Sequence, residues 1–564
     1  MKSIIINKKN IFFSFIILTI FSCTSKKEET KTTSKQPNII YIMSDDHTTQ
    51  AFGIYGSRLS SLNPTPTLDA VAKEGMIFNN CFVTNSICTP SRATIITGQY
   101  SQTNGVIDLE GSIKTEHQYL PIEMKKLGYQ TALVGKWHLE YQPNFDYYNI
   151  FTEHHQQGSY FDPNLTETGM KYAKYGTPEY EGKKYEGHSS DVITDITLDW
   201  LKNKRDKNKP FFLMHQFKAP HDDFEYAPRY KDYLKDVEIP EPSSLYDNEN
   251  NGSIATRGKN NSLINEIGSS VSKRNSIRNM GMRIWSDEYI KRNNPDFDIT
   301  QVEGLSDKAY THKTYQEYLK RYLRCVKGID DNVAKLIAYL KKENLYDNTI
   351  IVYTGDQGFM LGEHDYIDKR WMYDESMRMP FFVRYPETIK KGSYTDAIIN
   401  NTDFAPTLID LAGGKAPAKM QGNSFKHILE TGKEPENWQQ ATYYRYWMHM
   451  AHKHANPAHF GIRTKEYKLI FFYGKYWVDT KDPNAKWNKN SWGNKFTMDT
   501  PVAWEFYDLT KDPKEMNNIY NNPEYKETIA NLKTQLKAKR KEINEEDGAK
   551  YPHIQKVIDE HWDD

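Results

Sequence analysis

Four separated apolar runs constrain the fold of this chain most strongly. They lie at residues 37–43, 128–134, 209–217 and 348–354, and each contains β-branched or aromatic residues. Continuous apolar runs of this length are typical of parallel strands that are covered on both faces. A long amphipathic pattern at 315–342 supplies a covering helix. The sequence therefore predicts an α/β fold with a mostly parallel sheet sandwiched by helices.

Reactive side chains follow each of these four runs. They are Asp45 and Asp46, then Lys136 and His138, then His221, and finally Asp356 and Gln357. Open α/β sheets bind ligands at the carboxyl ends of their strands, so these side chains are expected to meet in one site. Two adjacent carboxylates at the end of a buried strand are costly without a positive partner, which predicts a bound cation.

A helix is expected to begin near Cys88, because Pro90 and the apolar residues Ala93, Ile95 and Ile96 follow it. Unpaired N–H groups and the positive end of the helix dipole would then favour an anion beside the cysteine. Arg92, one turn further on, can direct its guanidinium to the same place. In isolation, this motif favours a buried cysteine beside an ordinary proline-started helix over a reactive site. The converging strand ends reverse that preference.

Taken together, these motifs resemble those of the type I sulfatases of the alkaline phosphatase superfamily. The resemblance covers residues 37 to about 518 and includes Gly-Lys-Trp-His at 135–138, Ala-Pro-His at 219–221, Asp-Gln-Gly at 356–358 and the closing Tyr-Asp-Leu…Asp-Pro-x-Glu at 507–515. It implies an alkaline-phosphatase-like mixed, mostly parallel sheet between helices. It also implies a smaller C-terminal α+β subdomain with an antiparallel sheet.

The resemblance implies a nucleophile and a metal site. Cys88 would be converted to Cα-formylglycine (3-oxoalanine) by a formylglycine-generating maturation enzyme. The modified residue would then share a divalent cation with Asp45, Asp46, Asp356 and Gln357. A hard, all-oxygen ligand set suits Ca²⁺, with Mg²⁺ as the alternative.

The resemblance also implies the residues that handle the sulfate group and the protons. Arg92, Lys136 and Lys369 would surround the sulfate and stabilise its transition state. His138 would handle the proton of the hydrated formylglycine, and His221 would protonate the departing alcohol. Apart from the resemblance, His454, His459 and Arg463 lie in a basic, polar stretch of the C-terminal part that could bind the sugar, although the pattern favours a plain surface strand.

The N-terminus predicts export and a lipid anchor. Residues 1–23 have the features of a lipoprotein signal peptide, because Lys2, Lys8 and Lys9 precede an apolar run. Cys23, at the end of this segment, is the expected lipidation site. Residues 24–36 read as a flexible tether. We expect a catalytic domain at 37–433 with an insertion at 243–300, a C-terminal subdomain at 434–564, and a bacterial lipoprotein at the outer membrane, cell surface or periplasm.

The charge balance and the cysteine content bear on possible nucleic-acid partners and on disulfide pairing. The chain carries 74 basic and 74 acidic side chains, so no global field indicates a nucleic-acid partner. Apart from Cys23 and Cys88, only Cys81 and Cys325 remain, and they either pair or stay as two buried thiols.

The expected reaction is removal of sulfate from a sulfated poly- or oligosaccharide. An algal polysaccharide of the ulvan type is favoured over fucoidan, carrageenan, glycosaminoglycans or mucin, on resemblance alone. Two alternatives stay open. One is hydrolysis of phosphonate monoesters or phosphodiesters on the same scaffold, and the other is a non-catalytic glycan-binding lipoprotein.

Overall fold

The computed structural model describes residues 36–172, 181–246, 252–274, 279–286, 299–482 and 497–564. The predicted signal peptide, the lipidation residue Cys23 and the tether up to residue 35 lie outside these residues. Among the helices within them, none combines the length and the apolarity that crossing a bilayer requires.

A ten-stranded mixed sheet forms the centre of the fold. Its strand order is β13-β2-β12-β9-β1-β7-β3-β4-β5-β6. The pairs on either side of β1 are parallel, with β9 on one side and β7 on the other, whereas β12 and β5 run antiparallel to their neighbours. The strands are β1 (Asn38–Ser44), β2 (Met76–Phe82), β3 (Gln130–Gly135), β4 (Tyr147–Phe151), β5 (Asn164–Glu167), β6 (Lys183–Lys184), β7 (Phe211–Gln216), β9 (Thr349–Gly355), β12 (Phe381–Arg384) and β13 (Ser393–Asn400).

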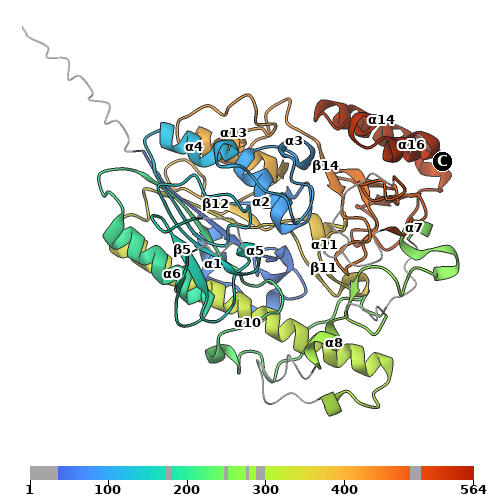
Figure 1. Cartoon of the computed structure of the whole chain (residues 1–564), viewed down its shortest axis with the longest axis horizontal. Coiled ribbons are helices and arrows are strands. Elements are labelled where there is room, and N and C mark those ends of the chain that lie inside the picture. Colours follow the sequence, from blue (N-terminus) through green and yellow to red (C-terminus); the bar gives the residue numbers. More distant parts are fainter. Residues whose placement is uncertain (1–35, 173–180, 247–251, 275–278, 287–298, 483–496) are drawn as a thin grey trace, which may run out of the picture. The chain divides into compact units, whose positions relative to one another are not determined.

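Helices cover both faces of this sheet, as the apolar runs predict. Alternate side chains of β1 point to opposite faces, so Ile39 and Tyr41 join one buried cluster and Ile40 and Ile42 join the other. Figure 1 shows α2 and α4 on one side of the sheet and α6 and α10 on the other. The helices outside the C-terminal part are α1 (Pro66–Ala72), α2 (Cys88–Thr97), α3 (Ser101–Asn104), α4 (Tyr119–Lys126), α5 (Glu153–Gln156), α6 (Ser189–Asp199), α7 (Ile254–Arg257), α8 (Met280–Ile284), α10 (Asp307–Lys342), α11 (Asp374–Met377), α12 (Phe404–Leu411) and α13 (Lys426–Thr431).

The long helix α10 begins at Asp307, eight residues before the amphipathic pattern that predicts it. The side chain of Ser306 caps its N-terminus by accepting a hydrogen bond from the backbone N–H of Ala309. The first turns bury Tyr310, Thr311 and Thr314 beside Asp307 and Lys308, which are exposed. Because polar residues are buried in these turns, the amphipathic pattern in the sequence does not extend to the start of the helix.

The C-terminal part forms a separate antiparallel sheet in the order β14-β15-β16-β17, which confirms the predicted α+β character. Helices α14 and α16 pack against it through a third buried cluster. A boundary at residue 433 stays a prediction. The elements are β14 (Ala441–Tyr446), β15 (His459–Thr464), β16 (Tyr467–Phe472), β17 (Ala503–Asp508), α14 (Lys526–Glu542), α15 (Asp547–Lys550) and α16 (Pro552–His561).

A small third sheet pairs a strand of the insertion at 243–300 with the strand that directly precedes Lys369. Its strands are β8 (Ser269–Ser270), β10 (Met360–Leu361) and β11 (Tyr366–Asp368), in the order β10-β11-β8. Strand β8 and helix α8 both belong to the described parts of the insertion, so this polar stretch contributes regular structure next to the strand that precedes Lys369.

The two cysteines that the sequence left open are both buried free thiols. Cys81 lies in β2 and Cys325 lies in α10. Burial raises the pKa of each thiol well above its ordinary value, so both stay protonated and unreactive.

Candidate active site

The parallel pairing of β1 with β9 brings three carboxylates together. Ser44 pairs with Gly355, so Asp45, Asp46 and Asp356 leave the sheet at the same edge. The backbone N–H of Asp46 donates to Asp356 Oδ1 over 3.1 Å. A side chain at Gly355 would place its Cβ 2.5 Å from the backbone oxygen of His47, so only glycine permits this close approach.

These three carboxylates have the geometry of a cation site. One oxygen from each of Asp45, Asp46 and Asp356 lies within 4.8 Å of the other two, and none of the residues is more than 1% exposed. Burial, together with the neighbouring carboxylates, raises the pKa of Asp46 well above its usual range and that of Asp356 to about 6. Without a cation, Asp46 and Asp356 are therefore protonated more readily than an ordinary carboxyl group.

Gln357 completes this oxygen set. Its Nε2 donates to Asp46 Oδ1, while its Oε1 is buried and has no hydrogen-bond partner among the described residues. Buried polar atoms are normally paired, so an orphaned amide oxygen beside three carboxylates fits a metal ligand. The donors are all hard oxygens, the kind that Ca²⁺ and Mg²⁺ prefer.

Three cationic side chains surround the carboxylates. The Nζ of Lys136, which follows β3, donates to Asp45 Oδ2. The Nζ of Lys369, which follows β11, lies 2.6 Å from both oxygens of Asp46. Burial raises the pKa of Asp45, but the charges of Lys136, His221, Arg92 and Lys369 together outweigh this effect and hold that pKa well below its ordinary value.

Arg92 is the third cation and lies on α2. Its Nη2 and Nε donate to Asp356 Oδ2 over 3.0 and 3.2 Å, and its Nη1 donates to Gln216 Oε1 over 2.8 Å. The side chain is buried, so these charge-assisted hydrogen bonds fix its guanidinium in one direction.

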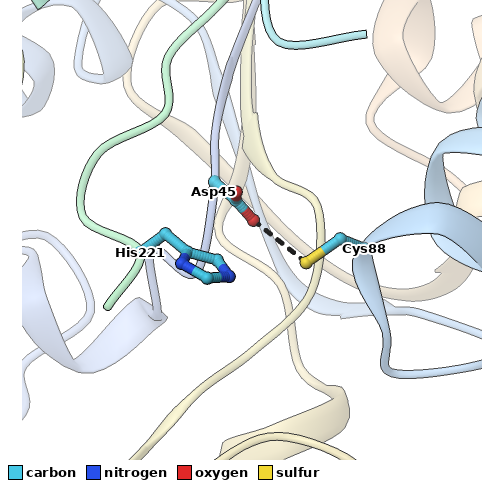
Figure 2. A group of neighbouring side chains, drawn as sticks. All are labelled: Asp45, Cys88 and His221. Carbon is cyan, nitrogen blue, oxygen red and sulfur yellow. Dashed lines mark hydrogen bonds between the residues drawn. The ribbon is translucent and has the colours of Figure 1, made fainter. Parts of the chain in front are cut away.

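Cys88 is the first residue of α2 and lies at the centre of this group. Its Sγ donates to Asp45 Oδ1 over 3.2 Å, and Figure 2 shows the ring of His221 beside the same pair. Burial, reinforced by the charge of Asp45, raises the pKa of the Cys88 thiol far above its ordinary value. The unmodified thiol therefore stays protonated and is a poor nucleophile.

The two histidines that the sequence singles out differ in surroundings. His138 is buried, its ring nitrogens lie 3.3 Å from Thr89 Oγ1, and burial with the nearby Lys136 holds its pKa well below the ordinary value. His221 lies with Nε2 3.9 Å from Asp46 Oδ2 and Nδ1 3.0 Å from Asp222 Oδ1. Burial lowers the pKa of His221 to about 4, although Asp45 and Asp222 act in the opposite direction.

The three residues predicted to grip the sugar are scattered. His454 borders the site, because its Nδ1 lies 2.8 Å from Asp368, the neighbour of Lys369. His459 stacks on Trp371 inside the second sheet, and Arg463 pairs with Asp374 over 2.8 Å. A role in substrate binding stays a prediction for all three.

Three polar residues that the sequence analysis did not identify support the charged groups. Gln216 accepts from Arg92, Thr89 contacts His138, and Gln157 accepts from Lys136 Nζ over 2.5 Å. Gln216 lies at the end of a predicted strand and Thr89 directly follows Cys88, so both could have been identified from their positions in the sequence. No local pattern marks Gln157, because its contact depends on how a loop folds back.

This fold and site define a class of hydrolase. Buried carboxylates paired with three cationic side chains lie at the carboxyl edge of an alkaline-phosphatase-like sheet, and helix α2 begins there at Cys88.

Comparison with known proteins identifies the family. Residues 37–414 match the Sulfatase family, and residues 362–488 and 494–542 match the C-terminal region of N-sulphoglucosamine sulphohydrolase. The chain belongs to the sulfatase family and is a hydrolase of sulfate esters.

Three relatives illustrate this membership. An N-acetylglucosamine-6-O-sulfatase of Bacteroides thetaiotaomicron is 37% identical over 96% of this chain and 92% of its own length. An ulvan-active sulfatase of Formosa agariphila is 27% identical over 89% of this chain and 79% of its own. A solved structure in complex with its substrate D-glucosamine-2-N,6-O-disulfate superposes with a TM-score of 0.78 at 38% identity, covering 91% of this chain and 99% of that one.

Proposed function

We propose that this sulfatase removes the 6-O-sulfate from a glucosamine-type residue of a sulfated carbohydrate. The observation that carries this proposal is the 38% identity and TM-score of 0.78 to the structure that holds D-glucosamine-2-N,6-O-disulfate. The N-acetylglucosamine-6-O-sulfatase at 37% identity supports the same sugar and the same sulfated position.

An ulvan-type substrate, which the sequence favoured, is the second candidate. Two ulvan-active sulfatases of Formosa agariphila support it, each at 27% identity. We rank it below the glucosamine substrate because 37% identity over nearly the whole chain is a closer relationship than 27%.

The cation in this proposal would be held by the buried oxygen set of Asp45, Asp46, Asp356 and Gln357, and Ca²⁺ fits the donors best. When bound, it supplies Lewis-acid polarisation of a sulfate oxygen. Lys136 and Lys369 flank these carboxylates, so their ammonium groups can orient the sulfate and stabilise the charge that develops on its oxygens.

The nucleophile in this proposal is formylglycine made from Cys88, because the buried thiol itself is protonated and unreactive. Its hydrate supplies a hydroxyl that can attack sulfur. His138 lies beside Thr89, one residue from position 88, and can accept the proton of that hydroxyl.

His221 is proposed to protonate the departing sugar oxygen. A sugar hydroxyl is a poor leaving group, so general acid catalysis is worth about 10²- to 10⁴-fold. A bound sulfate ester adds negative charge near the ring, which favours the imidazolium over the neutral form.

We also propose export as a lipoprotein that is anchored through Cys23, with maturation of Cys88 by a formylglycine-generating enzyme. The signal-like N-terminus and the buried thiol support these two steps. Mass spectrometry of the protein from a bacterial membrane fraction would test both, since diacylglycerol on Cys23 and oxidation of Cys88 each change a peptide mass.

The experiment that tests the main proposal measures sulfate release from matched sugars. N-acetylglucosamine-6-sulfate, D-glucosamine-2-N,6-O-disulfate, 3-O-sulfated glucosamine, an ulvan oligosaccharide and a phosphonate monoester are compared, with Cys88→Ala as the control. Release from the 6-sulfated sugars alone is the expected result. Release from the ulvan oligosaccharide or hydrolysis of the phosphonate instead, abolished in Cys88→Ala, would refute it, and activity that survives Cys88→Ala would refute the proposed nucleophile.

A further inference from the structure

The ring of His221 has a defined orientation because both neighbours of its Nδ1 are acceptors. Nδ1 lies 2.6 Å from the carbonyl oxygen of Asp222 and 3.0 Å from Oδ1 of the same residue. Neither atom can donate, so Nδ1 carries a proton. This arrangement turns Nε2 toward Asp46, and Figure 2 shows the ring directed at Asp45 and Cys88.

Asp222 is in turn held by an arginine from the insertion. The Nη1 of Arg283 donates to Asp222 Oδ2, and its Nη2 pairs with Asp223. The side chains are partly shielded, with 18% of Asp222 and 27% of Arg283 exposed. Oδ1 of Asp222 faces the histidine while Oδ2 faces the arginine, so one carboxylate bridges the two.

The arginine is carried on a firmly seated turn of helix. Helix α8 is joined to α10 by a hydrogen bond of 3.1 Å from Trp285 Nε1 to Thr314 Oγ1. A side chain at Gly281 would bring its Cβ within 1.8 Å of the Tyr310 hydroxyl, so the backbone of α8 packs directly against α10. Arg283 therefore projects from a support that is independent of the loop that bears His221.

We propose that Arg283 is a positioning residue for the general acid. It acts through Asp222 to hold the ring of His221 with Nε2 toward the substrate, and the idea rests on the proposed function of this site. In the step concerned, a hydroxyl oxygen of the hydrated formylglycine would form a bond to sulfur and give its proton to His138. At the same time the bond between sulfur and the sugar oxygen breaks, and its electron pair stays on that sugar oxygen. The oxygen takes the Nε2 proton, and the imidazolium becomes a neutral ring that still donates from Nδ1 to Asp222.

A double-mutant cycle on N-acetylglucosamine-6-sulfate tests this proposal. Arg283→Gln is expected to lower kcat by about 10- to 100-fold with KM changed by less than about 2-fold, because misorientation of an acid slows chemistry rather than binding. In the His221→Ala background, the same substitution is expected to cost less than about 2-fold. Arg283→Lys, which keeps a donor and the charge, is expected to recover most of the rate.

Arg229→Gln is the matched control. Arg229 makes a bidentate pair with Asp191 at 2.7 and 2.8 Å and is 47% exposed. Asp191 also accepts hydrogen bonds from Asn332 and Lys335, which lie outside the site. Its loss is expected to change kcat by less than about 2-fold. If Arg283→Gln does not fold, Asp222→Asn takes its place in the cycle, with the same expected pattern.

Three results would overturn the proposal: a normal kcat in Arg283→Gln, an effect confined to KM, or losses that multiply in the double variant. The wild-type rate tests the proposed function by itself. If the wild type releases no sulfate from the sugar, the proposed function fails. The double-mutant cycle can then still be run on another alkyl sulfate ester that the enzyme hydrolyses, because its alkoxide oxygen also needs a proton to leave.

Discussion

Removing divalent cations is expected to make the stability of this protein fall as the pH rises, and Asp356 is one of the acids responsible. Burial, reinforced by Asp45, raises the pKa of Asp356 from 3.8 to about 6 in the cation-free fold. A carboxyl with a raised folded-state pKa stabilises the fold fully below its unfolded-state pKa, and this contribution is lost as the pH rises through about 6. The difference between the folded-state and unfolded-state pKa values of Asp356 corresponds to about 3 kcal/mol of unfolding free energy. About 2 kcal/mol of this stabilisation is lost between about pH 4.5 and about pH 8.

Calcium is expected to reverse this trend. Ionised carboxylates bind the cation, so affinity rises with pH, and a calcium concentration about 1,000-fold above Kd adds about 4 kcal/mol. Urea unfolding at the two pH values, with EDTA or with CaCl₂, measures both effects. Asp356→Asn is the control, because it removes the titrating group while other acids keep their contributions. A wild type and an Asn variant with parallel pH dependence in EDTA would refute the reasoning, as would a lack of any calcium effect at about pH 8.

Two further predictions concern buried cations. Arg445→Met is expected to lower the free energy of unfolding by about 3–5 kcal/mol. Arg445 contacts Glu545 and lies 2.9 Å from both oxygens of Asp547 in a buried group, so its removal leaves two buried carboxylates without their partner. A urea midpoint that shifts no further than in the exposed Arg229→Gln variant would contradict this expectation. Lys369→Met is expected to lower kcat about 10²- to 10³-fold at saturating calcium, since it removes a preorganised charge from the proposed sulfate site. A loss below about 10-fold in steady-state sulfate release would rule that role out.

Much of the fold could be predicted from the sequence because its central strands are buried on both faces. The four apolar runs became β1, β3, β7 and β9, and the helix expected at Cys88 begins at that residue. Local signals of this kind depend on a few adjacent side chains and survive without knowledge of tertiary contacts. The start of α10 was missed because its first turns mix buried and exposed polar residues.

The charged centre was predictable where a residue follows a strand, and was not where a loop folds back from elsewhere. Asp45 and Lys136 each come directly after an apolar run, so topology alone brings them to one edge. Gln157 and Arg283 reach the site from segments whose sequences have no recognisable pattern. Their contacts depend on long-range packing, which single-sequence reasoning does not provide.

A local charge balance explains how a chain with no net charge can attract a sulfate ester. The three carboxylates of Asp45, Asp46 and Asp356 balance the three cations of Arg92, Lys136 and Lys369. This neutral group tolerates burial because each charge has a partner. A divalent cation would then leave the pocket with a net charge of about +2, in a low-dielectric setting where that charge acts strongly. The ester carries one negative charge and the released sulfate carries two, so the same excess that draws the substrate in also favours the more highly charged product. Sulfate release is therefore expected to become slower relative to chemistry as the pocket is made more positive, and free sulfate is expected to inhibit as a competitor of the substrate.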